Sequence, residues 1–509
     1  MTRDQQPTPF TELDLEAKQT AETPLAEPVA PATLVTNSAW GFAASIAATL
    51  VSGGVSIYAV RTLTERAWGR YSTATALIAI FAVLSDLGLA TLVLRNMTAR
   101  PDEESTVLGI GVRAVLRTAA VSAVAITPVA LVLGYDGATV RLVALGIPVL
   151  FVQPLTAVIS AAFNARRRLM YSSQLTLFTL PLWATVAIVL IAIGFGAAAL
   201  VIATVVSACA GFAACLFLLD RRLHLRPLLA VPRRAIGPFI RLALPIALIG
   251  GISILYDRID VVILSNLRGA VDVAQYSVAY SLAKLTWAIP AIVGAAFFPL
   301  YTKLTKDAPA EASRAFFLII RIFTYVSGAT AFFLTFAGRD LVKWVFGARY
   351  ADAAAPLAIL AWGLVASFQN YVLWYAVLAS RLERLVVPIQ ILGLTVNIIA
   401  NLALIPSLGP SGAALAFLLS DVVTTGGQFV LVHRRIHPVP VASLAIRPVV
   451  ACVPAVVAGV TLLPISPIVS GIVGTTLYVV TLQALKYVSF EEWRPLTGAV
   501  EAALRSCRR

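Results

Sequence analysis

Three polar residues, one of them charged, lie deep inside an otherwise apolar stretch, where charged side chains are rare. Lys284 is ten residues beyond Ala274, about 15 Å along a helix that rises 1.5 Å per residue. Ser277 and Ser281 precede it at helical spacing. A charge at that depth costs at least about 2.5 kcal/mol unless it faces a cavity or a partner. We therefore predict a cavity site in which Lys284 attracts an anionic group; the alternative is a lysine paired with an acid for packing.

Asp257, Arg258 and Asp260 form a second charged group in the apolar stretch before it. Asp257 and Asp260 share a helix face at i, i+3, so one carboxylate is predicted to pair with another helix. Arg258 is expected to point elsewhere and is a candidate for the substrate cavity. Asp260 is a candidate for ion coupling, and a purely structural network is the alternative.

Asp86 and Asp421 are acids inside two further apolar stretches. A desolvated carboxyl can exchange a proton during a transport cycle, so both are ion-coupling candidates. A local hydrogen bond is an equally simple explanation of Asp86.

Amide side chains form a third set of candidates. Gln390, Asn397 and Asn401 fall on one helical stripe, and Gln369 lies in a cluster of amides and aromatic rings near Trp374. Such groups suit sugar hydroxyls and sugar faces, although amides also bond between helices. We place Asn397, Asn401 and Gln369 with the substrate-cavity candidates.

The elements that must position these side chains are membrane-spanning helices. Hydrophobic residues make up 59% of the 509, charged residues 13%, and mean hydropathy is +0.88. A spanning helix needs about 20 apolar residues. The sequence predicts an all-α polytopic membrane protein with fourteen transmembrane helices. Their predicted ranges are 38–60, 71–94, 115–133, 142–164, 174–194, 197–219, 239–264, 274–300, 315–337, 354–379, 386–405, 412–432, 441–462 and 465–487.

The placement of Lys and Arg predicts the orientation. The even-numbered connections and the C-terminal end carry most of the basic residues, which favours both termini in the cytoplasm. Residues 1–36 are acidic and proline-rich, and we expect a disordered cytoplasmic tail there without the features of a signal peptide. Residues 489–509 form a basic cytoplasmic tail.

Landmarks in the first half of the chain recur in the same order about 200 residues later. The sequence Arg221-Arg222-Leu223-His224 is matched by Arg434-Arg435-Ile436-His437, for example. Such repeats are typical of transporters built from two lobes around a cavity. We predict an N-lobe at 37–224, a C-lobe at 225–437 and two additional helices at 438–488. The alternative is that basic loops recur in any membrane protein.

Several function classes are excluded by the sequence. It has no Gly-rich loop ending in Gly-Lys-Ser/Thr, no His-Glu-x-x-His and no Gly-x-Ser-x-Gly, so we expect neither an enzyme nor a nucleotide-driven pump. The four cysteines have no metal-ligand spacing, and we expect no cofactor or metal. The net charge of +14 comes largely from loops beside the membrane rather than from a nucleic-acid surface. Energy must come from an ion gradient, the membrane potential or the substrate gradient.

Four short segments occur in an order that resembles a known family. They are RTLTERAWGRY at 61–71, SDLGL at 85–89, DRIDVVIL at 257–264 and AQYSVAY at 274–280. With the two-lobe architecture, they resemble the Wzx-type oligosaccharide flippases, the polysaccharide-transporter branch of the multidrug/oligosaccharidyl-lipid/polysaccharide exporter (MOP) superfamily. The likeness covers nearly the whole chain after the tail.

The resemblance implies two MATE-like six-helix lobes, with two additional C-terminal helices, in the bacterial cytoplasmic membrane. It implies alternating access, in which an undecaprenyl-pyrophosphate-linked glycan crosses the bilayer, with a polysaccharide polymerase or co-polymerase as a further partner. The first alternative is a drug/cation antiporter of the same superfamily, which usually has twelve spans. The second is a glycan polymerase or ligase, which needs a large outward loop, whereas the longest one here, at 338–352, is short.

Overall fold

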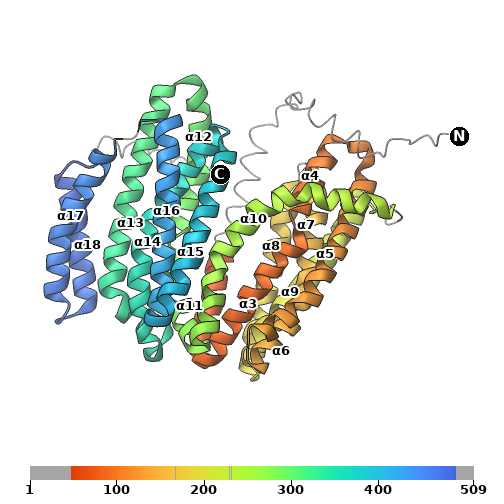
Figure 1. Cartoon of the computed structure of the whole chain (residues 1–509), viewed down its shortest axis with the longest axis horizontal. Coiled ribbons are helices and arrows are strands. Elements are labelled where there is room, and N and C mark those ends of the chain that lie inside the picture. Colours follow the sequence, from red (N-terminus) through yellow and green to blue (C-terminus); the bar gives the residue numbers. More distant parts are fainter. Residues whose placement is uncertain (1–47, 167, 229, 231, 439, 489–509) are drawn as a thin grey trace, which may run out of the picture. The chain divides into compact units, whose positions relative to one another are not determined.

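A computed structural model describes residues 48–488 except 167, 229, 231 and 439. Every secondary-structure element in this part of the chain is a helix (Figure 1). The all-α prediction is confirmed for these residues. The predicted tails at 1–36 and 489–509, and the beginning of the predicted span 38–60, lie outside them.

The chain divides into two compact units. Among the described residues, unit 1 takes 48–55 and Leu77–Ile254, and unit 2 takes Ser56–Ala76 and 255–488. Helices α3 (Glu65–Asp86) and α10 (Arg233–Arg268) contribute to both units. The other helices of unit 1 are α4 (Leu89–Ala99), η1 (Pro101–Glu103), α5 (Glu104–Val132), α6 (Gly137–Leu145), α7 (Ile147–Ala165), α8 (Leu169–Ala192), α9 (Ala198–Leu218) and η2 (Leu219–Leu223).

Unit 2 contains the polar candidates other than Asp86. Besides its parts of α3 and α10, its elements are α11 (Ala270–Leu285), α12 (Ala288–Asp307), α13 (Pro309–Phe346), η3 (Ala348–Ala353), α14 (Ala354–Ala379), η4 (Glu383–Leu385), α15 (Val387–Leu408), α16 (Pro410–Arg435), α17 (Val441–Leu462) and α18 (Pro467–Ala484). Helix α14 packs against α13 and α16, α16 packs against α15, and α18 packs against α13 and α17 (Figure 1).

Among the described residues, eleven helices are long and apolar enough to cross a membrane, and the bent α10 would make a twelfth. The protein is thus a multi-pass membrane protein, and the count of fourteen stays a prediction. The predicted continuous helix 274–300 is wrong, because it is broken at Thr286 and Trp287 between α11 and α12. Pro290 favours a break at this point, because it has no N–H to donate to the Thr286 carbonyl four residues earlier and its ring crowds that carbonyl.

One ion pair joins three elements of unit 1. Glu104 in the first turn of α5 is only 8% exposed and accepts from Arg166 at the end of α7, with Nε 3.0 Å from Oε2. Arg166 Nη1 also donates to the carbonyl of Leu223 in η2, at 3.1 Å. The guanidinium therefore links α5, α7 and η2 through a largely buried carboxylate.

Arg166→Ala is expected to destabilise the protein by about 2 kcal/mol, since it leaves Glu104 buried without its cation. The 39% exposure of the Arg166 side chain keeps this loss below that of a fully buried pair. Arg226→Ala is the matched control, because the Arg226–Asp220 pair is 85% and 54% exposed and such pairs contribute little. Thermal unfolding midpoints in detergent measure both variants, and equal midpoints would contradict the structural role of Arg166.

Candidate functional site

The carboxylate of Asp257 on α10 contacts two cationic side chains and one phenol hydroxyl. Lys284 Nζ lies 3.3 Å from Asp257 Oδ2, and Arg258 Nε lies 3.2 Å from the same atom. Tyr280 donates its hydroxyl hydrogen bond to Asp257 Oδ1. The prediction that Arg258 points away from its neighbour is therefore wrong. The sequence had left open a lysine paired with an acid, and Lys284 does form such a pair.

Lys284 sits in the last turn of α11, where the helix dipole favours a cation. Its Nζ lies 5.5 Å from the ring centre of Tyr280 and 5.6 Å from that of Trp287, both within cation–π range. Phe417 of α16 packs on both rings, with centroids 6.1 Å and 6.4 Å away. The lysine side chain is nevertheless 44% exposed. It is thus held by an acid and an aromatic box while its ammonium remains accessible.

One turn further along α10, a second carboxylate accepts a hydrogen bond from a tyrosine of α11, and this carboxylate is buried. Asp260 is 1% exposed, and its Oδ2 accepts from the hydroxyl of Tyr276. Tyr276, Tyr280 and Lys284 follow one another at intervals of four, so one face of α11 meets both carboxylates of α10. The prediction that a carboxylate of this pair contacts another helix is confirmed for both of them.

Ser277 and Ser281 were predicted to line the cavity with Lys284, but the structure shows a different contact between them. Ser281 Oγ donates to the backbone carbonyl of Ser277 at 2.7 Å, a bond within α11. Tyr276 and Tyr280 were not among the predicted site residues, although their spacing of four from each other and from Lys284 was a signal for them. Trp287 and Phe417 were not predicted either, because only the folded chain brings them to Lys284.

Two of the three predicted amides of α15, Asn397 and Asn401, are buried, and Asn397 bonds to another helix. Asn397 Nδ2 donates to Ser420 Oγ of α16 at 3.2 Å, and Ser420 lies 2.9 Å from the hydroxyl of Tyr256 on α10. Asn401 Nδ2 lies 2.9 Å from Asn397 Oδ1, and both asparagines are fully buried. Asn401 Oδ1 has no partner among the described residues. These groups place polar atoms of α10, α15 and α16 in one layer.

Two further candidates on α14 and α16 face different neighbours. Asp421 is 4% exposed and accepts from the Ser367 hydroxyl of α14. Gln369, two residues further along α14, instead donates to Thr324 Oγ1 of α13 at 2.9 Å. Residues at i and i+2 lie on different sides of a helix, so Gln369 is turned away from the contact that holds Asp421.

Asp86 belongs to unit 1, where it lies at the break between α3 and α4. Its Oδ2 accepts from the backbone N–H of Gly88 at 3.2 Å, and its buried Oδ1 has no partner among the described residues. Leu87 and Gly88 both have positive φ, and a Cβ on Gly88 would come within 2.7 Å of Ile246. The hydrogen bond from the Gly88 N–H to Asp86 is the local one that the sequence analysis gave as the alternative explanation of this acid.

The fold and these buried charges define a class, that of polytopic helical membrane proteins with a polar interior. Residues 59–355, more than half of the chain, match the polysaccharide biosynthesis protein family. The chain belongs to this family. No curated protein matches it significantly.

Solved structures of MOP transporters have the same fold. The lipid II flippase MurJ in an inward closed conformation is 12% identical, with a TM-score of 0.66 over 87% of this chain and 99% of MurJ. An inward-facing multidrug resistance MATE transporter is 17% identical, with a TM-score of 0.56 over 77% and 95%. A MOP transporter from Pyrococcus furiosus is 16% identical, with a TM-score of 0.55 over 80% and 95%.

Proposed function

We propose that the protein moves a lipid-linked oligosaccharide, or a related cell-envelope precursor on undecaprenyl pyrophosphate, across the bacterial cytoplasmic membrane by alternating access. Both termini are cytoplasmic in this proposal, and a polysaccharide polymerase or co-polymerase receives the product. The single observation that carries it is the pair of cations on Asp257, beside aromatic rings, in a member of the polysaccharide biosynthesis protein family.

The chemistry of this group suits a pyrophosphate headgroup. Asp257, Arg258 and Lys284 have side chains that are 22%, 34% and 44% exposed, so an incoming anion can reach both cations. Phosphate oxygens make strong charge-assisted hydrogen bonds with guanidinium and ammonium groups. A pyrophosphate thus replaces Asp257 as their partner while the substrate is bound, and the carboxylate takes them back after release. Trp287, which is half-buried, offers aromatic surface for the first sugar.

The same proposal assigns ion coupling to buried carboxylates. Asp260 and Asp421 are almost completely buried, and each accepts a hydroxyl hydrogen bond from another helix. A proton or cation that binds there changes which of these bonds the helices can keep, so it can couple to the transport cycle. Asp86 is the corresponding candidate in unit 1.

Asp421→Asn is expected to flatten the pH dependence of transport, since an amide cannot exchange the proton. Initial export rates between about pH 5.5 and 8 compare this variant with the wild type, with Asp260→Asn and with Asp86→Asn. Asp307→Asn, at an exposed position at the end of α12, is the control. Profiles identical to that of the wild type would assign these acids to structure alone.

Depletion of the protein in its own host tests the proposed substrate class. Undecaprenyl-pyrophosphate-linked glycan should accumulate on the cytoplasmic side, and surface polysaccharide should fall. Sensitivity to cationic drugs should not change. Drug hypersensitivity with normal glycan export would instead favour the antiporter.

A further inference from the structure

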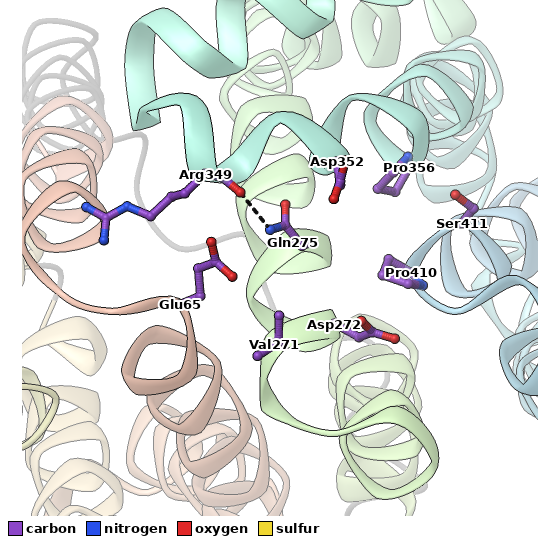
Figure 2. Close-up of a pocket in the computed structure, with 9 residues that line it drawn as sticks. All are labelled: Glu65, Val271, Asp272, Gln275, Arg349, Asp352, Pro356, Pro410 and Ser411. Carbon is purple, nitrogen blue, oxygen red and sulfur yellow. Dashed lines mark hydrogen bonds between the residues drawn. The ribbon is translucent and has the colours of Figure 1, made fainter.

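A second polar site lies in unit 2 at the beginnings of α3, α11 and α16, whereas Lys284 lies in the last turn of α11. A cavity of about 330 Å³ is lined by nine residues that these helices, η3 and α14 contribute (Figure 2). Three of them are acids from three different elements: Glu65 of α3, Asp272 of α11 and Asp352 of η3. Elements distant in the sequence thus bring their carboxylates to one cavity.

A buried hydrogen-bond acceptor in this cavity has no partner. Gln275 is 6% exposed, and its Nε2 donates to the backbone carbonyl of Arg349 at 3.2 Å. Its Oε1 is buried without a partner among the described residues. Figure 2 shows this amide between Glu65, Arg349 and Asp352. Because an orphaned buried acceptor is costly, the position is poised to accept a hydrogen bond from a ligand.

The one cation in the lining is already engaged. Arg349 donates from Nη1 to the carbonyl of Leu63 at 3.1 Å and from Nη2 to that of Arg61. Asp272 is paired with Arg268, whose Nε lies 3.4 Å from Oδ2. The acceptors that remain for a ligand include the carboxylates of Glu65 and Asp352 and the Oε1 of Gln275. A ligand that fits must donate hydrogen bonds and must not be an anion.

The geometry and size favour a sugar over a metal ion. Among the described residues, no three His, Cys, Asp or Glu side chains come together closely enough to hold a metal. The volume is at the small end of ligand pockets and suits one pyranose ring. Pro356 and Pro410 add apolar surface to the lining, and an apolar surface can pack against the C–H face of a sugar ring.

We propose that this cavity binds one neutral or amino-bearing sugar unit. The inference deepens the proposed function, on which it rests, because the lining comes mostly from connections that the charge pattern predicts outside the cell. The cavity would hold a sugar of the glycan on the release side and would discriminate against acidic sugars.

Binding of free monosaccharides to the full-length protein in lipid nanodiscs tests the inference. Saturation-transfer NMR titrations with glucose and glucosamine should give saturable binding, whereas glucuronate should give none. Asp352→Ala, at an exposed position that folding tolerates, should weaken binding at least about fivefold. Asp307→Ala, exposed at the end of α12, is the matched control and should bind as the wild type does. Glu65→Gln should admit glucuronate, because it removes a repelling charge.

The proposal would be overturned if the wild type and Asp352→Ala bound glucose with equal affinity, or if the wild type bound glucuronate. It would also be overturned if sodium or calcium chloride alone produced the spectral change that is assigned to sugar binding. A parallel export assay in cells separates this failure from failure of the proposed function. Normal glycan export without sugar binding would contradict the sugar site but not the proposed function. Sugar binding that Asp352→Ala weakens, in a protein that exports no glycan, would support the site and contradict the proposed function.

Discussion

Lys284→Met lowers glycan export at least about 30-fold while the protein stays inserted and abundant. The substitution keeps an apolar stem against Tyr280 and Trp287 but removes the ammonium that a pyrophosphate would contact. Losing one partner of a partly desolvated charge pair costs about 2 kcal/mol or more, which corresponds to this factor. Lys284→Ala, which also removes the stem, is expected to abolish export. Surface polysaccharide in a deletion strain that carries each variant provides the measurement.

Lys306→Met is the matched control, because Lys306 is exposed in the last turn of α12 in the same unit. Lys284→Arg keeps a cation and should retain part of the activity. Immunoblots of membrane fractions check that each variant is inserted. Export at the wild-type rate by Lys284→Met would leave the lysine as a packing partner of Asp257 and remove it from the substrate site.

Gly393→Ala is expected to destabilise the protein by about 1–3 kcal/mol and to reduce export, because it forces α15 away from α16. A Cβ at Gly393 would come within 2.1 Å of Thr424 Oγ1, a buried side chain that donates to the carbonyl of Ser420 at 2.8 Å. Separation of the two helices would also lengthen the hydrogen bond from Asn397 to Ser420. Thermal unfolding midpoints and export rates measure the two effects.

Gly426→Ala on α16 is the control for this substitution, because a Cβ there meets no atom within 4 Å. It should leave stability unchanged or raise it slightly, since alanine favours the helix. The double variant Gly393→Ala with Thr424→Ala removes the clashing atom and should recover much of the lost stability. A midpoint for Gly393→Ala that equals that of Gly426→Ala would show that the close approach of α15 and α16 is not required.

The helical architecture and the depth of the charges could be predicted from the sequence, because runs of apolar residues and their polar interruptions are local signals. The break between α11 and α12 could not be predicted from Pro290, because Pro128, Pro154 and Pro181 lie inside continuous helices. The partners of each charged side chain could not be predicted from the sequence either. The sequence shows that Asp257 and Asp260 share a face, but only packing shows that α11 meets this face through Tyr276 and Tyr280.

The amides show the same limit. Asn397 and Asn401 lie on one buried stripe, as their spacing predicts. Gln369 belongs to a helix that is packed on two sides, by α13 and by α16, and its spacing carries no information about which neighbour it meets. Its bond to Thr324 of α13 is a property of the folded chain. Side-chain partners between helices therefore had to come from the structure.

Transbilayer movement in proteoliposomes tests the central claim most directly. The purified protein is reconstituted with an undecaprenyl-pyrophosphate-linked oligosaccharide, and the fraction accessible to an external glycosidase is followed over time. We predict that the wild type makes the inner-leaflet glycan accessible, that Lys306→Met does so equally, and that Lys284→Met does not. No movement by the wild type, or equal movement by Lys284→Met, would contradict the account.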